Sequence, residues 1–164
     1  YREGKMHGRG KMVFADGNTY EGDYSEDKKH GRGKYVWANG DTYEGDYSEG
    51  KRHGRGKKVF ASGNTYEGDW SEDKKHGRGV STYAVDGKTP TPGLSTTWNA
   101  GDVCDCVWKE DRRHGACRYT FFNGEVYACT FVDGLCKEFD VRQAAVRADP
   151  KAFKFASDSM VRFL

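Results

Sequence analysis

Apolar and polar residues alternate along much of the chain in short stretches with a period of two, which is typical of β-strands. In the stretch 20–24, two tyrosines and a glycine alternate with a glutamate and an aspartate. Three residues after Tyr24 stands Asp27, a residue that tolerates a positive φ. The equivalent later positions hold only glycine or aspartate: Gly50, Asp73, Asp111 and Gly134. The pattern therefore predicts a strand followed by a tight turn.

A second strand is expected to return from His30 and to end on an aromatic residue. The aromatic residues at these ends are Trp37, Phe60, Trp98 and Phe121. Hairpin-turn dipeptides stand between consecutive strand pairs: Asp16-Gly17, Asn39-Gly40, Ser62-Gly63 and Asn123-Gly124. We therefore predict an all-β fold, an elongated, single-layer, twisted antiparallel sheet of tandem β-hairpins that resembles a solenoid. Strands about 4.8 Å apart, two per repeat, would add about 10 Å to the rod for each repeat.

The strand pattern belongs to a repeat of 23 residues. The segment Tyr20-Glu21-Gly22-Asp23-Tyr24 recurs from Tyr43 and from Tyr66, and His-Gly-Arg-Gly follows from residues 7, 30, 53 and 76. These motifs resemble the MORN (membrane occupation and recognition nexus) repeat, with its YEG-x-W/Y and GK-x-HG-x-G signature. Residues 1–79 match it closely. Because the chain begins inside a repeat, we expect further repeats before it.

We divide the chain into a repeat array at 1–140 and a C-terminal segment at 141–164. The array consists of a partial repeat at 1–19, repeats at 20–42 and 43–65, a repeat at 66–103 with an insertion at 83–97, a degenerate repeat at 104–126 and a partial one at 127–140. The insertion is interpreted as a projecting loop, either tolerated or used for binding. Asp149-Pro150 predicts the start of a short C-terminal helix that caps the sheet edge. A docking helix is the alternative.

Side-chain parity predicts which residues face one another within a repeat. The expected pairs are Tyr24 with Gly31, Gly22 with Gly33, Asp23 with Arg32 and Glu21 with Lys34. The glycines would then serve as sockets for aromatic rings on one face. The charged pairs would form a ladder on the other face.

Four cysteines replace residues of the repeat pattern on the expected aromatic face: Cys104, Cys106, Cys117 and Cys129. In the expected register Cys106 lies opposite Cys117. Converging thiolates are zinc ligands, and a Cys106–Cys117 disulfide would require an oxidising compartment. Packing as small hydrophobic residues is favoured over metal binding, because three of the four replace glycine. Apart from structural zinc at this site, no cofactor is expected.

Composition and charge narrow the function classes. The formal net charge is only +2, whereas a nucleic-acid-binding domain is usually strongly basic, so no nucleic-acid partner is expected. No apolar run is long enough for a membrane helix. All five histidines occupy the same place in the repeat, which indicates a structural role rather than a single general base. No catalytic residue is predicted, and the protein is expected not to be an enzyme.

Cations cluster near the first turn of each repeat and offer a candidate surface for anionic lipid. They are Lys28, Lys29, Lys51, Arg52, Lys74 and Lys75. A periodic row of cations attracts phosphoinositides or other anionic phospholipids. The alternative interpretation is a solvated edge that prevents aggregation, since acidic residues occupy the same turns.

The resemblance implies a scaffold or adaptor at membranes or the cytoskeleton, and the nearly pure-repeat cytoskeletal scaffolds of the family are the most similar. We therefore expect a cytoplasmic, cytoskeleton- or membrane-associated protein that forms a homodimer and binds other cytoskeletal or membrane-associated proteins. The aromatic residues expected at the interface are Trp98, Trp108, Tyr119, Phe121, Tyr127, Phe131 and Phe153. An anionic-lipid-binding module and a regulatory segment of a larger enzyme are the alternatives.

Overall fold

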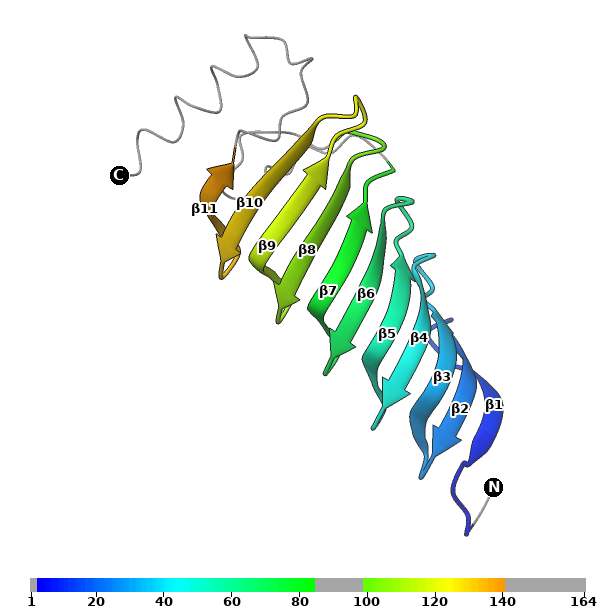
Figure 1. The fold of residues 1–164 in the computed structure, drawn as a ribbon. Coiled ribbons are helices and arrows are strands. Elements are labelled where there is room, and N and C mark those ends of the chain that lie inside the picture. Colours follow the sequence, from blue (N-terminus) through cyan, green and yellow to red (C-terminus); the bar gives the residue numbers. More distant parts are fainter. Residues whose placement is uncertain (1–2, 85–98, 141–164) are drawn as a thin grey trace.

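The computed structural model describes residues 3–84 and 99–140, which form one open antiparallel sheet (Figure 1). Its eleven strands are β1 (Gly8–Val13), β2 (Thr19–Ser25), β3 (Lys28–Val36), β4 (Thr42–Ser48), β5 (Lys51–Val59), β6 (Thr65–Ser71), β7 (Lys74–Thr82), β8 (Val103–Lys109), β9 (Arg112–Thr120), β10 (Val126–Val132) and β11 (Leu135–Asp140). Each strand pairs with the next one in the chain. The predicted all-β, single-layer architecture is confirmed.

Two sequence-based predictions lie wholly or mostly outside the described residues. These are the helix at 141–164 and the loop at 83–97, of which only residues 83 and 84 are described. The sheet itself continues across the insertion, because β7 pairs with β8 in the register of the preceding repeats and places Gly77 opposite Trp108. Within the described residues there is no helix that could span a membrane.

The first turn of each repeat has the backbone that its residues predict. Glu26 and Asp27 both have positive φ, 50° and 64°, as a two-residue type I′ hairpin requires. The equivalent pairs in later repeats repeat this conformation, with glycine or aspartate at the second position. The predicted tight turn at Asp27 is therefore confirmed.

The register within a repeat corrects half of the predicted pairs. Gly22 lies opposite Gly33, and Glu21 opposite Lys34, as predicted. A β-bulge then inserts two residues of β3, Gly31 and Arg32. Asp23 consequently faces His30 and Tyr24 faces Lys29, so the predicted Tyr24–Gly31 and Asp23–Arg32 pairs are wrong. Those two kinds of pair occur instead between repeats, where β3 meets β4: Gly31 with Tyr47, and Arg32 with Asp46.

Two residues of the repeat signature stabilise the bulge. Gly31 has a φ of 57°, and a Cβ there would lie 2.8 Å from a carboxylate oxygen of Asp23. The same carboxylate accepts a hydrogen bond from the backbone N–H of Arg32 at 3.3 Å. The His-Gly-Arg-Gly motif therefore needs its first glycine for the backbone conformation, not as a socket for a ring.

The core is a row of aromatic rings on one face of the sheet. Tyr20, Tyr43 and Tyr66 are completely buried, and neighbouring rings meet edge to face, as Tyr43 and Trp70 do at 5.2 Å. A Cβ on Gly33 would lie 2.5 Å from Cε2 of Tyr20. The paired glycines are thus sockets for the tyrosine that begins each repeat, as the sequence predicted for Gly22 and Gly33.

Side chains connect successive repeats at both ends of the strands, where the turns lie, and each row of turns is called an edge of the array here. At one edge the Asp73 carboxylate accepts a hydrogen bond from the backbone N–H of Arg52 at 3.0 Å, and Asp111 accepts one from Lys75 at 2.9 Å. At the other edge a side-chain oxygen accepts from the backbone of the next repeat. These pairs are Asn18 with Ala38, Asp41 with Ala61, Asn64 with Ala84 and Asp102 with Phe122, all at 2.8–2.9 Å. The contacts recur with the repeat and align its turns.

Candidate functional site

A row of cations lies over the aromatic face, with at least one in each full repeat; the repeat at 43–65 has a second, Lys58, over Trp37 and Phe60. Lys29 Nζ lies 4.7 Å from the Tyr35 ring centre, and the Arg52 guanidinium lies 4.3 Å from that of Trp70. Lys75 Nζ lies 4.7 Å from both Tyr66 and Trp108. Arg113 continues the row over Trp108, Tyr119 and Phe131 at 5.5–5.8 Å. The ring faces attract these cations electrostatically.

Burial separates these cations from ordinary surface lysines. Desolvation lowers the pKa of Lys29, and it lowers the pKa of Lys75 to about 8 although the charge of Asp111 acts in the opposite direction. A cation held against rings in this way is a structural part of the aromatic face. It is poorly placed to leave that face for a lipid phosphate.

The six candidate lipid-binding residues therefore fall into two groups. Lys29, Arg52 and Lys75 belong to the cation row over the rings. The other three are exposed and form ion pairs with glutamates of the next repeat: Lys28 with Glu49, Lys51 with Glu72 and Lys74 with Glu110. Because each of these lysines is paired with a glutamate, the row of first turns carries alternating positive and negative charges rather than a uniformly positive charge.

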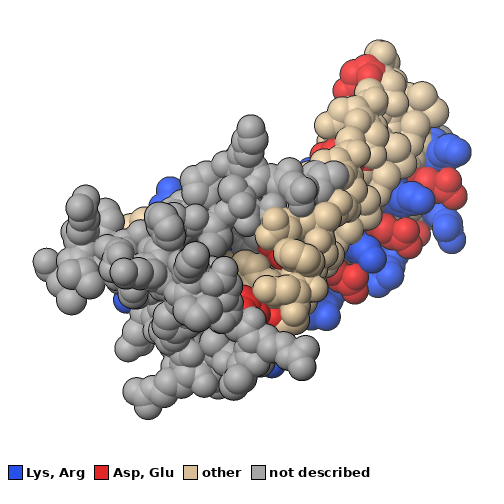
Figure 2. Space-filling model, turned by 90° about the horizontal axis from the view of Figure 1, so that it is seen from above, with Lys and Arg blue, Asp and Glu red and all other residues tan. Residues whose placement is uncertain are grey.

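The opposite face carries the charged ladder. Arg55 pairs with Asp69 at 3.3 Å, and Lys57 pairs with Glu67 at 3.4 Å, both across β5 and β6. Figure 2 shows Lys and Arg mixed with Asp and Glu along one side of the array. A shallow hollow on this face between β3 and β6 is lined by both signs of charge, including Arg32, Glu44 and Lys57. Its charged lining consists of four cations, Arg32, Lys34, Arg55 and Lys57, and two glutamates, Glu44 and Glu67, of which Glu67 pairs with Lys57.

The structure places the seven predicted interface residues in three different settings. Trp108, Tyr119 and Phe131 are buried inside the chain, at 6%, 1% and 0% exposure. Phe121 and Tyr127 are half-buried and meet edge to face at 5.2 Å. Trp98 and Phe153 lie outside the described residues. Of the described set, Phe121 and Tyr127 retain the surface that a partner would contact.

A neighbouring aromatic residue was missed by the sequence analysis. Phe122 is 65% exposed at a turn position where the other repeats have alanine, namely Ala38, Ala61 and Ala84. Its backbone N–H donates to Asp102 at 2.9 Å, as those alanines donate to their own neighbours. Aligning the repeats at this turn would have revealed the substitution.

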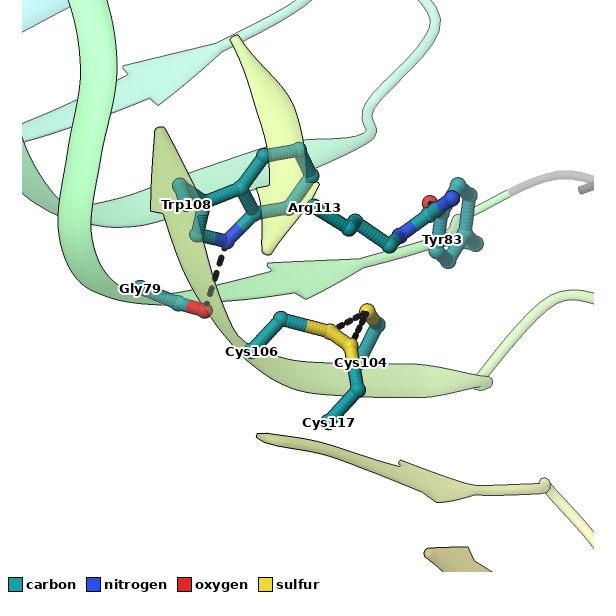
Figure 3. Close-up of a disulfide and its surroundings, with 7 residues drawn as sticks. All are labelled: Gly79, Tyr83, Cys104, Cys106, Trp108, Arg113 and Cys117. Carbon is teal, nitrogen blue, oxygen red and sulfur yellow. Dashed lines mark hydrogen bonds between the residues drawn. A yellow bond between two sulfur atoms is a disulfide. The ribbon is translucent and has the colours of Figure 1, made fainter. Parts of the chain in front are cut away.

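Four cysteines converge on the aromatic face of β8, β9 and β10. Cys106 lies directly opposite Cys117, as predicted, and the two form a disulfide with a Cα–Cα distance of 4.1 Å. The Cys104 sulfur lies 2.7 Å from that of Cys106 and 4.0 Å from that of Cys117 (Figure 3). Cys129 lies opposite Cys117 on the next strand. All four side chains are buried.

The surroundings of the cysteines are both desolvated and cationic. Burial raises the pKa of the Cys104 thiol, while Arg113, Tyr119 and the charge of Lys75 act in the opposite direction. The pKa of Cys129 is raised chiefly by a hydrogen bond with Cys136, and further by burial. The fifth cysteine, for which the sequence offered no role, thus interacts with Cys129.

The comparison with family models identifies the repeat. The MORN repeat model matches residues 1–19, 20–42, 43–65, 66–88 and 107–126, which together make up most of the chain. The chain belongs to the MORN-repeat family. No curated relative matches it. MORN repeats are non-catalytic modules that generally take part in protein–protein or membrane and lipid interactions.

Proposed function

We propose that this protein is a non-enzymatic scaffold that forms a homodimer through its C-terminal repeats and presents the rest of the array to other proteins at the cytoskeleton or membrane periphery. The observation that carries the proposal is Phe122, a largely exposed aromatic side chain where the other repeats have alanine. Aromatic residues are favoured anchors of protein interfaces. The half-buried Phe121 precedes it in the chain and meets the half-buried ring of Tyr127 edge to face.

Self-association is the partner class that this surface supports best. A two-fold dimer uses the same patch on both copies, and it is the commonest arrangement of soluble oligomers. The lipid-binding alternative has less support, because the cations expected to carry it are stacked on rings or paired with glutamates.

The test is the solution mass of the chain by size-exclusion chromatography with light scattering over a range of concentrations. We expect a value near twice 18.5 kDa for the unmodified chain. Phe122→Ala restores the residue of the other repeats, so it should shift the mass toward a folded monomer. The matched control is Phe14→Ala at the first strand's end, which should leave the mass unchanged.

A monomer at every concentration would refute the dimer. The same conclusion would follow if Phe122→Ala and Phe14→Ala had equal effects on the mass. Flotation with vesicles that contain anionic phospholipid, compared with neutral vesicles, tests the lipid alternative. Binding that depends on the anionic lipid and on low salt would favour that function instead.

A further inference from the structure

Three residues that form one pocket in the regular repeats are replaced together in the repeat that contains β8 and β9. Cys104 takes the place of Tyr66, Cys106 that of Gly68, and Cys117 that of Gly79. In the regular pocket the tyrosine hydroxyl lies against both glycines. In the pocket of the β8–β9 repeat, three cysteine side chains stand where the regular pocket has the tyrosine ring and its two glycines. Filling space alone would need small or apolar residues here, but it would not need sulfur at all three positions.

The three sulfurs lie together in one small cluster, and the Cys104–Cys117 separation is already close to that of two ligands of one ion. Their atoms all lie within 4.8 Å of one another, and the Cys104 to Cys117 distance is 4.0 Å. Thiolates bound to zinc at about 2.3 Å in a tetrahedral arrangement lie about 3.8 Å apart. The side chains are buried, so few water molecules compete for the position between them. Once the Cys106–Cys117 bond is reduced, a three-sulfur site requires side-chain rotations that separate Cys106 from Cys104, now 2.7 Å away, and from Cys117.

Burial raises the pKa of the Cys104 thiol, and the charges around the cluster partly oppose that effect. Arg113 and Lys75 both exert a positive potential on the Cys104 sulfur, and Tyr119 hydrogen-bonds with it. Both cations are held in place by aromatic rings, over which they continue the cation row. Three thiolates and a divalent ion carry a net charge of −1, which these cations offset. A thiolate site needs such polar neighbours when it is buried.

We propose that, in the reduced protein, Cys104, Cys106 and Cys117 bind one zinc ion through their sulfurs. Soft thiolate ligands select zinc among the common divalent ions. Cys129 lies outside the set, because it interacts with Cys136 on the far side of β10. The site thus has three protein ligands, and any fourth ligand would be exogenous.

The disulfide and the zinc site exclude each other, since they use the same two sulfurs. Reduction of the Cys106–Cys117 bond takes two electrons and two protons and yields two thiols. In the experiment a trialkylphosphine supplies the electrons and becomes the phosphine oxide, while water supplies the oxygen and the protons. The three thiols then release their protons as they bind the ion. Oxidation by a small disulfide reverses the sequence and releases zinc.

The experiment is a Co²⁺ titration of the phosphine-reduced full chain, followed by Zn²⁺ displacement and metal analysis of the protein. We expect about one ion per chain, with the sulfur-to-cobalt charge-transfer absorption and the visible bands of tetrahedral cobalt. The oxidised chain should bind no ion. Cys104→Ser should weaken binding at least tenfold, whereas Cys129→Ser and Cys136→Ser should leave it unchanged.

The matched control is the triple variant C104Y/C106G/C117G, which restores the pocket of the preceding repeat and should fold without binding cobalt. If the triple variant does not fold, the contrast between Cys104→Ser and Cys136→Ser decides. The proposal is overturned if the reduced chain binds no more cobalt than the oxidised one, if the absorption lacks the charge-transfer band, or if Cys136→Ser is as damaging as Cys104→Ser.

Discussion

The repeats that begin at Tyr20, Tyr43 and Tyr66 and the repeat at β8 and β9 build the same piece of sheet around different cores. In the first group a buried tyrosine lies over two paired glycines, and a Cβ on the first glycine would lie within 2.5 Å of the Cα of the second. In the second, three sulfurs occupy that pocket, while strand pairing and the bulge keep their places. The backbone contacts of the repeat are therefore independent of what fills the pocket. The residues that fill one pocket, however, depend on one another: a large ring requires two glycines, whereas three cysteines fit together without it.

This dependence can be broken most sharply by moving one cysteine into a regular repeat. Gly56→Cys should destabilise the chain by about 3 kcal/mol, because its Cβ would lie 2.5 Å from Cε2 of Tyr43 and the packed ring cannot withdraw. Adding Tyr43→Cys should relieve the overlap, so the double variant should cost less than the sum of the single ones by about 2 kcal/mol. Urea unfolding under reducing conditions measures all three.

The reverse change provides the control for this cycle. Cys117→Gly removes a small side chain from a pocket that has no tyrosine ring, and it should cost only about 1 kcal/mol. Strictly additive costs for Gly56→Cys and Tyr43→Cys would mean that the pocket is not a coupled set.

A second prediction concerns what the two kinds of repeat share. The Asp73 carboxylate accepts from the backbone N–H and from Nε of Arg52, each at 3.0 Å, and Asp111 accepts from the backbone of Lys75. Asp73→Gly should cost about 2 kcal/mol and Asp111→Gly slightly less, whatever fills the pocket nearby. Glycine is the appropriate substitute, because both aspartates have positive φ and Gly50 occupies the same place in another repeat. Denaturant midpoints measure the loss.

The same position offers the opposite change. Gly50→Asp should add the missing carboxylate opposite Lys29 and should stabilise the chain by about 0.5 kcal/mol, since aspartate tolerates this backbone region. If Asp73→Gly had no effect while Asp111→Gly did, the edge contacts would not be common to the two kinds of repeat.

The strands and turns, which depend on local sequence, were predictable. The register between the strands of a repeat was only partly predictable, because it depends on a two-residue β-bulge. Alternation and turn residues identified the strands, and the pairing of Cys106 with Cys117 followed because that pair lies beyond the bulge. The partners of Tyr24 were wrong, because a bulge of Gly31 and Arg32 shifts the register. The residue pattern does not reveal this shift, because an insertion of two residues leaves the alternation between the two faces of the sheet unchanged.

The split between stacked and paired cations was also missed, although a signal existed. Lys28 and Lys29 are identical in chemistry, and only their position relative to the turn separates them. Counting outward from the Glu26 and Asp27 turn places Lys29 opposite Tyr24, on the aromatic face. The depth of its burial depends on rings from neighbouring repeats, which the sequence of one repeat does not contain.

The boundary between the two kinds of repeat should have its own pH dependence, because Lys75 lies there between Tyr66 and Trp108. Burial lowers the pKa of Lys75 to about 8 from an ordinary 10.5. Above pH 8 the folded chain loses this proton while the unfolded chain keeps it, so this residue makes the free energy of unfolding rise with pH. From pH 8 to 9 Lys75 should contribute about 1 kcal/mol at most, whereas the buried thiols of Cys104 and Cys129, whose pKa is raised, contribute a slope of the opposite sign. Lys75→Met should remove the Lys75 contribution from the slope, whereas Arg52→Met, at the equivalent place over Trp70, should leave the slope unchanged because arginine stays protonated. Urea midpoints of the three proteins across this interval measure the effect, and parallel curves for Lys75→Met and the unmodified chain would show that Lys75 keeps its charge on the aromatic face.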